Sequence, residues 1–356
     1  MSTRCLLTTR SIYDAVAIYP RNAVFGKREL GGWCAAVLLT VCGCAAPAAT
    51  TTNAGRAHTG GLSLITEPGA GDRPFIALID SAQRSVQVTM YELEDQQVEQ
   101  ALAAAASRGV QVMVLLDHGQ YGAGRPGNQA AYNYLRARGV TVAWAPGYFA
   151  LTHQKSILID GRVAAIMTLN LTPAYYQSSR DFAVLDYRPA DVAVIAQTFD
   201  ADLRHQPLTP STGNGDLVWS PGAQAPIGAL IAHARRSLQV ESEEMDDPAI
   251  TSELCQAARR GVRVQVLMTY QAPWRTALGY LAGCGAQVRT YAASAALYIH
   301  AKLIRVDGRT VFIGSQNLSR QSLTYNRELG VITHSSPIVA STGDTFRADF
   351  AAARSY

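Results

Sequence analysis

The sequence predicts an α/β protein made of two repeated α/β/α sandwich halves with mixed, largely parallel sheets. Three observations support this fold class: an internal repeat, a regular alternation of strand-like and helix-like segments, and an Asp-Gly turn late in each half. With 356 residues, of which 48% are hydrophobic and 16% charged, the chain is long enough for two domains. The same numbers exclude a disordered chain and a small disulfide-stapled scaffold.

The internal repeat is visible when the two halves are aligned directly. The segment PFIALIDSAQRSVQVTMYELED at 74–95 matches PIGALIAHARRSLQVESEEMDD at 226–247, and LTHQKSILIDGR at 151–162 matches YIHAKLIRVDGR at 298–309. Similarity of this length within one chain indicates a duplicated structural unit, so we expect the halves to be related by a pseudo-two-fold axis.

Each half follows the same order of elements. An apolar-periodic helix ends near Arg84 or Arg236, and a strand, an Ala-rich helix closed by Arg-Gly, a second strand, another helix and a third strand follow. The strands are expected at 86–90, 110–116 and 140–144, and at 238–242, 262–268 and 286–290. Strands that alternate with helices indicate crossover connections and parallel pairing. The sequences IDGR and VDGR, each an Asp-Gly pair between apolar runs, predict a hairpin after these strands.

The N-terminal region differs in composition from the rest of the chain. Residues 27–44 combine a basic flank, a short apolar run and small residues, which is the layout of a secretory signal. The apolar run from Gly32 to Val41 is too short to cross a bilayer as a helix, so we expect export without a transmembrane anchor. The residues before Cys44 also resemble a bacterial lipoprotein processing box, in which Cys42 is atypical. A lipidated cell-surface protein and an unlipidated secreted or periplasmic protein are both consistent with this pattern.

The expected division of the chain follows from the repeat and from this leader. It is an export signal at 1–44, a flexible tether at 45–61, a first half at 62–205, a linker with Pro and Gly at 206–225, and a second half at 226–356.

Charge and cysteine content limit the partners. The formal net charge is +4, but residues 1–44 hold five Lys/Arg against two Asp/Glu, so the remainder is close to neutral. A protein that grips a nucleic acid duplex needs a basic surface, which disfavours that partner. Beyond the leader only Cys255 and Cys284 remain, without the spacing of a zinc site. They either form one disulfide in an oxidising compartment or stay as two buried thiols.

The residues that could take part in catalysis recur at the same spacing in both halves. A His and a Lys stand two apart on the strand leading into the Asp-Gly turn, an Asn follows 17 residues after the His, and an acid follows 28 residues after it. These residues are His153, Lys155, Asn170 and Asp181 in the first half, and His300, Lys302, Asn317 and Glu328 in the second. Positions i and i+2 of a strand share a face, so each half presents an imidazole beside an ammonium group.

This arrangement suits phosphoryl transfer. One imidazole can attack phosphorus while the other protonates the leaving group. The lysine and asparagine side chains offer donors to the charged transition state. No carboxylate cluster suited to a divalent ion accompanies them, so the sequence predicts no metal and no cofactor.

The motifs resemble those of the phospholipase D superfamily, whose signature is HxKxxxxD followed by GSxxN. The second half contains the full signature in His300, Lys302, Asp307, Gly314, Ser315 and Asn317. The first half matches at His153, Lys155, Asp160 and Asn170, but Met167 and Thr168 replace Gly and Ser. The resemblance covers the chain from about residue 62 to its end and implies one active site at the interface of the two halves.

The resemblance also implies roles for the site residues. It points to a covalent phosphohistidine on His153, with His300 as the general acid that later activates water. The downstream acids are expected to cross over, so that Glu328 orients His153 and Asp181 orients His300. Thr168 and Ser315 are expected to contact phosphoryl oxygens, whereas Asp160 and Asp307 are expected to be structural, since Asp before Gly suits a hairpin turn.

Three functions remain open at this point. The first is a phospholipase D that hydrolyses glycerophospholipids to phosphatidic acid and a head group at a membrane surface. The others are an exported nuclease or related phosphodiesterase, and an inactive binding scaffold. Export and the near-neutral charge favour lipid. A phosphatidyl-transferring synthase such as a cardiolipin synthase is disfavoured, because no pair of membrane spans precedes the motifs. Two motifs in one chain predict a monomer.

Several aromatic and histidine residues complete the set of candidates. The aromatic residues either line an apolar substrate groove or pack in the core; they are Tyr121, Tyr148, Phe149, Tyr175, Tyr176, Trp274 and Tyr298. His118 and His205 have no counterpart in the other half and are expected to be ordinary surface histidines.

Overall fold

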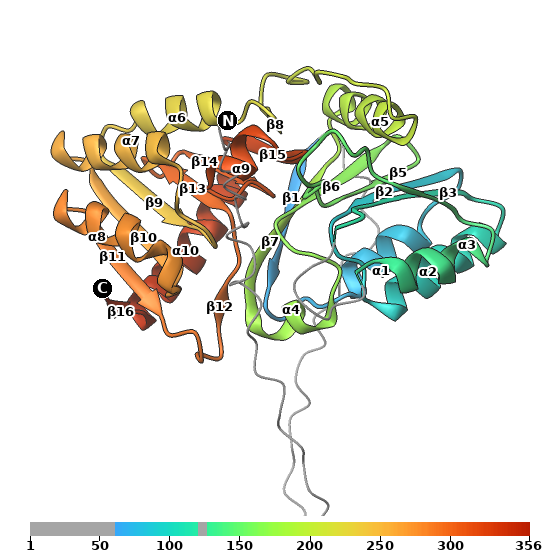
Figure 1. The fold of residues 1–356 in the computed structure, drawn as a ribbon, viewed down its shortest axis with the longest axis horizontal. Coiled ribbons are helices and arrows are strands. Elements are labelled where there is room, and N and C mark those ends of the chain that lie inside the picture. The colour runs from blue at the N-terminus through green and yellow to red at the C-terminus, as the bar shows by residue number, and fades with distance from the viewer. Residues whose placement is uncertain (1–60, 120–126) are drawn as a thin grey trace, which may run out of the picture. The chain divides into compact units, whose positions relative to one another are not determined.

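The computed structural model describes residues 61–119 and 127–356 (Figure 1). The predicted export signal, Cys44, nearly all of the tether and Tyr121 lie outside the described residues. Among the described residues, no helix combines the length and the apolar character that crossing a bilayer requires.

The first half is built on an eight-stranded mixed sheet. Its main path runs in the order β1 (Leu62–Glu67), β7 (Ser179–Asp186), β6 (Val163–Met167), β5 (Ser156–Ile159), β2 (Ser85–Met90), β3 (Gln111–Leu116) and β4 (Thr141–Trp144). The eighth strand, β12 (Tyr298–Ile299), comes from the second half and pairs with β7. The helices of this half are α1 (Arg73–Asp80), α2 (Gln96–Ser107), α3 (Gln129–Arg136), α4 (Pro173–Ser178) and α5 (Pro189–Leu203).

The second half repeats this plan. Its sheet has the order β16 (Arg354–Ser355), β11 (Gln287–Tyr291), β10 (Arg263–Thr269), β9 (Ser237–Glu241), β13 (Leu303–Val306), β14 (Thr310–Gly314), β15 (Glu328–Thr333) and β8 (Leu217–Ser220). Its helices are α6 (Gln224–Ala232), α7 (Pro248–Arg259), the 3-10 turn η2 (Ala272–Trp274), α8 (Arg275–Gly283), α9 (Arg320–Thr324) and α10 (Ser336–Ala352).

The predicted fold class of two mixed α/β halves is confirmed, with a larger antiparallel share than expected. Among the named strands of the described residues, parallel pairing occurs in β2–β3–β4, β9–β10–β11 and the short β12–β7 contact. The hairpin strands and the strands that follow them pair antiparallel, since each returns directly beside its predecessor. The expected linker 206–225 also contains β8, whose four buried residues complete the second sheet beside β15.

Local signals explain why the two halves fold alike. Asp95 caps α2 by accepting hydrogen bonds from the backbone of Gln97 and Val98, and Asp247 caps α7 in the same way. The predicted hairpins are present as β5–β6 and β13–β14. At their turns Asp160 and Gly161 have φ of 55° and 64°, the left-handed backbone that a tight hairpin requires.

The acids of these turns also tie the hairpins to the sheets. Asp160 accepts hydrogen bonds from the backbone N–H groups of Gln83, Arg84 and Ser85, before and at the start of β2. Asp307 accepts the equivalent set from the backbone at 235–237, before and at the start of β9. Both acids therefore make the structural contacts expected of them.

Among the described residues, three of the four hydrophobic clusters organise the layers. One lies between the first sheet and α1, α2 and α3, and a second between the second sheet and α6, α7 and α8 (Figure 1). The third lies between the halves: residues of β5, β6 and β7 are buried against residues of β13, β14 and β15, with α5 and α10 contributing. The two sheets are thus held together by a shared apolar layer. Cys255 and Cys284 form a disulfide, one of the two alternatives that the sequence left open.

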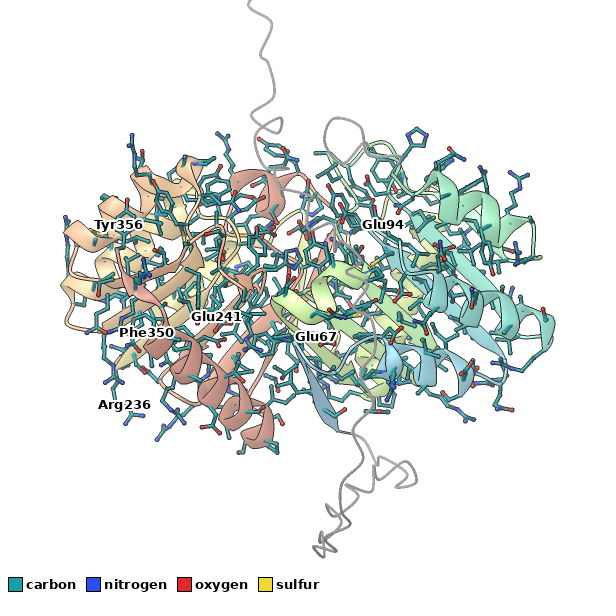
Figure 2. All side chains as sticks on the ribbon, turned by 90° about the horizontal axis from the view of Figure 1, so that it is seen from below. Glu67, Glu94, Arg236, Glu241, Phe350 and Tyr356 are labelled. Carbon is teal, nitrogen blue, oxygen red and sulfur yellow. A yellow bond between two sulfur atoms is a disulfide. The ribbon has the colours of Figure 1, made fainter. Side chains whose placement is uncertain are left out.

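A buried polar cluster accompanies that layer. Arg180 of β7 pairs with Asp349 of α10 at 2.5 Å and also donates to the backbone carbonyl of Glu67. Glu241, at the end of β9, is 1% exposed, and neither of its carboxyl oxygens has a hydrogen-bond partner among the described residues (Figure 2). Burial raises the pKa of Glu241 to about 8, with Asp349 adding to the effect and Arg180 opposing it.

Glu241→Gln is therefore expected to stabilise the protein in a pH-dependent way. The raised pKa means that the folded state binds a proton that the unfolded state releases near its ordinary pKa of 4.5, so wild type loses stability as pH rises from there toward 8. The variant should gain about 1–3 kcal/mol over wild type at pH 8 and little at pH 5. Denaturant unfolding at the two pH values measures this, with the exposed Glu94→Gln as control. An equal gain at both values would contradict the electrostatic origin.

Candidate active site

The two His-Lys segments are held by the half to which they do not belong. Before β5, the backbone N–H of Gln154 donates to the carbonyl of Arg327 at 2.9 Å, and the N–H of Arg327 donates to the carbonyl of Leu151 at 2.8 Å. In the other copy, β12 pairs with β7, and the His300 N–H donates to the carbonyl of Arg180. The expectation that each His and Lys lies on the hairpin strand itself is corrected, because these crossing contacts hold the segment just before that strand.

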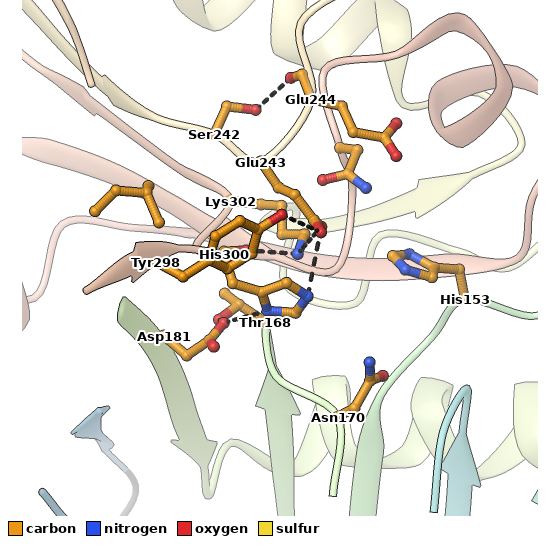
Figure 3. Close-up of polar contacts among 12 residues, drawn as sticks. His153, Thr168, Asn170, Asp181, Ser242, Glu243, Glu244, Tyr298, His300 and Lys302 are labelled. Carbon is orange, nitrogen blue, oxygen red and sulfur yellow. Dashed lines mark hydrogen bonds and ion pairs between the residues drawn. The ribbon is translucent and has the colours of Figure 1, made fainter. Parts of the chain in front are cut away.

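The orienting acids cross between the halves as well. His153 Nδ1 lies 2.9 Å from Glu328 Oε2, and His300 Nδ1 lies 2.8 Å from Asp181 Oδ1 (Figure 3 shows the second pair). All four side chains are buried. Because the acids take Nδ1, the Nε2 atom of each imidazole is the one available for chemistry.

The electrostatics of the first pair favour a neutral imidazole. Burial lowers the pKa of His153 to about 4; Lys155 and Lys302 act in the same direction and Glu328 opposes them. Burial would raise the pKa of Glu328, but His153, Lys155 and a hydrogen bond from Ser322 hold it below its usual value. The ionised carboxylate can only accept, so Nδ1 of His153 carries the proton and Nε2 keeps its lone pair. That is the form an attacking nucleophile needs.

The two lysines are deeply buried and face their own histidine segments. Lys155 Nζ donates to the carbonyl of His153 at 2.6 Å, and Lys302 Nζ donates to the carbonyl of His300 at 2.5 Å. Burial lowers the pKa of Lys155 to about 7; the charge of Lys302 adds to this and that of Glu328 opposes it. The charges of one half thus act on groups of the other, which places both His-Lys pairs in one site.

The asparagines of the two motifs are also buried. Asn170 Nδ2 donates to Glu92 Oε2 at 3.2 Å, and the backbone N–H of Asn317 donates to Ser322 Oγ at 2.8 Å. The side-chain carbonyl oxygen of each asparagine has no hydrogen-bond partner among the residues that the structure describes.

Thr168 and Ser315 lie behind the catalytic groups rather than facing the substrate. Thr168 Oγ1 donates to Asp181 at 2.5 Å and accepts from the backbone N–H of Phe182. Ser315 Oγ exchanges hydrogen bonds with the backbone of Leu329. Both hydroxyls are fully buried, and a hydroxyl has one proton to donate. The expectation that they contact phosphoryl oxygens is therefore corrected: Thr168 positions Asp181, and Ser315 fixes the strand that carries Glu328.

Met167 replaces the glycine of the signature in the first half. It is fully buried in the core of the first half and stands opposite Ala183 in the sheet. Its counterpart Gly314 stands opposite Gly330, where an added Cβ would lie 2.5 Å from the Gly330 Cα. The first half accommodates a Met–Ala pair where the second requires two glycines.

One acid that contacts the second motif, Glu243, was not predicted from the sequence. Glu243 Oε2 lies 2.8 Å from Lys302 Nζ and 3.4 Å from His300 Nε2 (Figure 3). In the aligned repeat its counterpart is Tyr91, whose ring lies edge-on to His153 at 4.5 Å. In the aligned repeat a charged residue stands at the position of an aromatic one, and this difference is the signal that could have identified Glu243.

The aromatic candidates divide into two groups. The Tyr175 ring stacks on His300 at 4.7 Å and the Tyr298 ring lies 6.2 Å from it, so these two lie at the site. The other described candidates are Tyr176 and Trp274, which are buried in the cores, and Tyr148 and Phe149, which contact each other. His118 and His205 both contact Trp144 instead of the two motifs. Within the described residues, no group of three His, Cys, Asp or Glu side chains is placed to hold a metal ion.

Comparison with known proteins agrees with this geometry. Cardiolipin synthase B of Escherichia coli (strain K12) is 26% identical over 307 residues, which cover 73% of each chain. The structure of phosphatidylserine synthase from Haemophilus influenzae Rd KW20 superimposes with a TM-score of 0.62 at 13% identity, covering 82% of this chain and 87% of the other. Polyphosphate kinase from Porphyromonas gingivalis gives the same TM-score at 16% identity, over 80% of this chain and 46% of that one, and at these identities both likenesses show the fold alone.

A family model matches both halves. The model described as "Cardiolipin synthase, PLD-like domain" matches residues 75–203 and again residues 227–350, so each copy contains one of the His-Lys motifs. Together with the crossed His–acid pairs, these matches show that the chain belongs to the cardiolipin synthase, PLD-like domain family of the phospholipase D superfamily.

Proposed function

We propose that this protein is a phospholipase D-type enzyme that cleaves glycerophospholipids through a phosphohistidine. The observation that supports it most is the buried His153, whose Nδ1 lies 2.9 Å from Glu328 Oε2 so that Nε2 is free of that contact, beside two buried lysines. In the first step His153 Nε2 attacks phosphorus, and the head-group oxygen leaves with a proton from His300. In the second, His300 removes a proton from the acceptor, whose oxygen displaces His153. Lys155 and Lys302 balance the charge on the phosphoryl oxygens.

The acceptor decides whether the reaction is hydrolysis or transfer. Water gives phosphatidic acid, and an alcohol gives a new phosphodiester. The family and the cardiolipin synthase relatives support phospholipid chemistry and are compatible with either acceptor. Because these relatives are named cardiolipin synthases, the phosphatidyl transferase that the sequence disfavoured is again a candidate. We propose hydrolysis as the reaction in water and phosphatidyl transfer when an alcohol competes. Export, the lipid-surface location, the monomeric state and the absence of a cofactor remain predictions.

One parallel assay tests the function. Protein beginning at residue 45 is offered phosphatidylcholine vesicles, plasmid DNA and bis(p-nitrophenyl) phosphate, with His153→Ala as control. We expect head-group release, formation of phosphatidylethanol when ethanol is present, and no loss of rate in EDTA, because Lys155 and Lys302 supply the positive charge. If wild type degrades plasmid and leaves vesicles intact, the enzyme is a nuclease. If no substrate is turned over, the inactive scaffold replaces the proposal.

A further inference from the structure

Glu243 places a carboxylate against the reactive edge of the second motif. Its Oε2 lies 2.8 Å from Lys302 Nζ and 3.4 Å from His300 Nε2, while Oε1 accepts a hydrogen bond from the Tyr298 hydroxyl at 3.1 Å (Figure 3). The Glu243 side chain is 14% exposed. It follows the end of β9, so its position is set by the strand that precedes it.

The atoms that Glu243 contacts are the ones a phosphodiester needs. His300 Nδ1 is bound to Asp181, so Nε2 must be the atom that reaches the leaving or entering oxygen. Lys302 Nζ is the donor of this half to a phosphoryl oxygen. A carboxylate oxygen that contacts both atoms therefore lies where substrate oxygen binds, and the substrate must displace it.

Glu243 also brings a negative charge to that place. Burial alone would raise the pKa of Glu243, but the charges of His300 and Lys302 outweigh it and hold the pKa well below the usual range. The neighbouring Glu244 differs: burial and the charge of Glu243 raise the pKa of Glu244 to about 8. Figure 3 shows the Glu244 carboxyl turned away from Lys302. Glu243 thus supplies a full charge near neutral pH, whereas Glu244 is mostly neutral there.

The first motif has no such charge at the matching position. Tyr91 aligns with Glu243, its ring lies edge-on to His153, and Lys155 Nζ lies 4.9 Å from the ring centre. The repeated halves thus share their histidines, lysines and crossed acids but differ in charge beside the reactive edge of the imidazole. The Glu243 carboxylate therefore lies on the side of the site where the leaving group departs and the acceptor enters.

We propose that Glu243 is a specificity-determining residue that makes the site bind singly charged phosphodiesters in preference to doubly charged phosphate monoesters. The inference rests on the proposed function and deepens it. A diester carries one negative charge and a monoester close to two near neutral pH, so the carboxylate, displaced from Lys302 and His300 but still beside the phosphoryl subsite, repels the monoester more. The product of hydrolysis, phosphatidic acid, is a monoester. Glu243 therefore weakens product binding while the substrate is still accepted.

The experiment compares two ligands that differ by one methyl group and one charge. Dissociation constants of dimethyl phosphate and methyl phosphate are measured by phosphorus NMR line broadening at about pH 7.5, for wild type, Glu243→Gln and the matched control Glu244→Gln. We expect Glu243→Gln to bind methyl phosphate at least about 10-fold more tightly than wild type does. Its dissociation constant for dimethyl phosphate should change by no more than about 3-fold. Glu244→Gln should change neither constant.

Other outcomes overturn the proposal. Unchanged or weaker binding of both ligands to Glu243→Gln would mean that the carboxylate only holds Lys302 and His300 in place, and equal strengthening of both would remove the charge discrimination. If Glu243→Gln does not fold, Glu243→Ala, which removes the same charge, should strengthen methyl phosphate binding in the same direction. The binding measurement needs no turnover. Failure of the proposed function would appear in the vesicle assay as intact lipid, and the two results can therefore be distinguished.

Discussion

His153→Ala is expected to abolish the covalent phosphoenzyme. His153 is the histidine whose pKa burial lowers to about 4, and the hydrogen bond to Glu328 leaves Nε2 with its lone pair. Removing the ring removes the atom that bonds to phosphorus, and no other side chain of the site replaces it. Wild type quenched during turnover of a phosphorus-labelled diester should carry an acid-labile, base-stable label, whereas the variant should carry none. Its rate on natural substrates should fall by about 10²–10⁴-fold or more.

His300→Ala is the matched comparison, because it removes an equally buried imidazole from the same site. It should lose a comparable rate on lipids, whose alkoxide leaving group needs a proton. With a p-nitrophenyl ester, whose leaving group needs none, it should still form the labelled enzyme. Labelling lost in His300→Ala and kept in His153→Ala would reverse the two roles.

Glu328→Gln should cost about 10³-fold or more in turnover although the side chain keeps its shape. Ser322 Oγ and Asn326 Nδ2 both donate to Glu328 Oε1, at 2.6 and 3.0 Å. A glutamine must therefore place its oxygen there and turn its amide nitrogen toward His153 Nδ1. That nitrogen donates, so Nδ1 must accept and the imidazole proton moves to Nε2, which removes the nucleophilic lone pair. Single-turnover phosphoenzyme formation measures the loss.

Asn326→Ala is the control for this prediction. It removes one donor to the carboxylate but leaves the ionised acid on His153, so the rate should fall by less than about 10-fold. A near-normal rate in Glu328→Gln would mean that Glu328 holds the fold and not the tautomer of His153.

The sequence predicted the repeated elements well because their signals are local. Alternating strands and helices, the capping Asp95 and Asp247, and the Asp-Gly turns each depend on a few neighbouring residues. Strands β1 and β8 were not predicted. Each completes its sheet by pairing with a strand more than a hundred residues away, β7 for β1 and β15 for β8, and no short-range pattern records that pairing.

The site shows the same division between what spacing reveals and what it leaves out. Matched His, Lys, Asn and acid positions identified the groups, and the family resemblance implied the crossing of Asp181 and Glu328. Spacing could not show which acceptor a hydroxyl donates its hydrogen bond to. For this reason Thr168 was predicted to contact the substrate and not Asp181. Glu243 was not predicted because matched spacing identifies only positions at which the halves agree, and at this position they differ.

Because of the crossing contacts, both His–acid pairs depend on the contact between the two sheets. Gln154 is tied to Arg327 and His300 to Arg180, and each histidine takes its acid from the opposite sheet. A fluctuation that parts the two sheets therefore separates both histidines from their acids at the same moment. We therefore expect activity only from the closed arrangement, in which both imidazoles hold their acids.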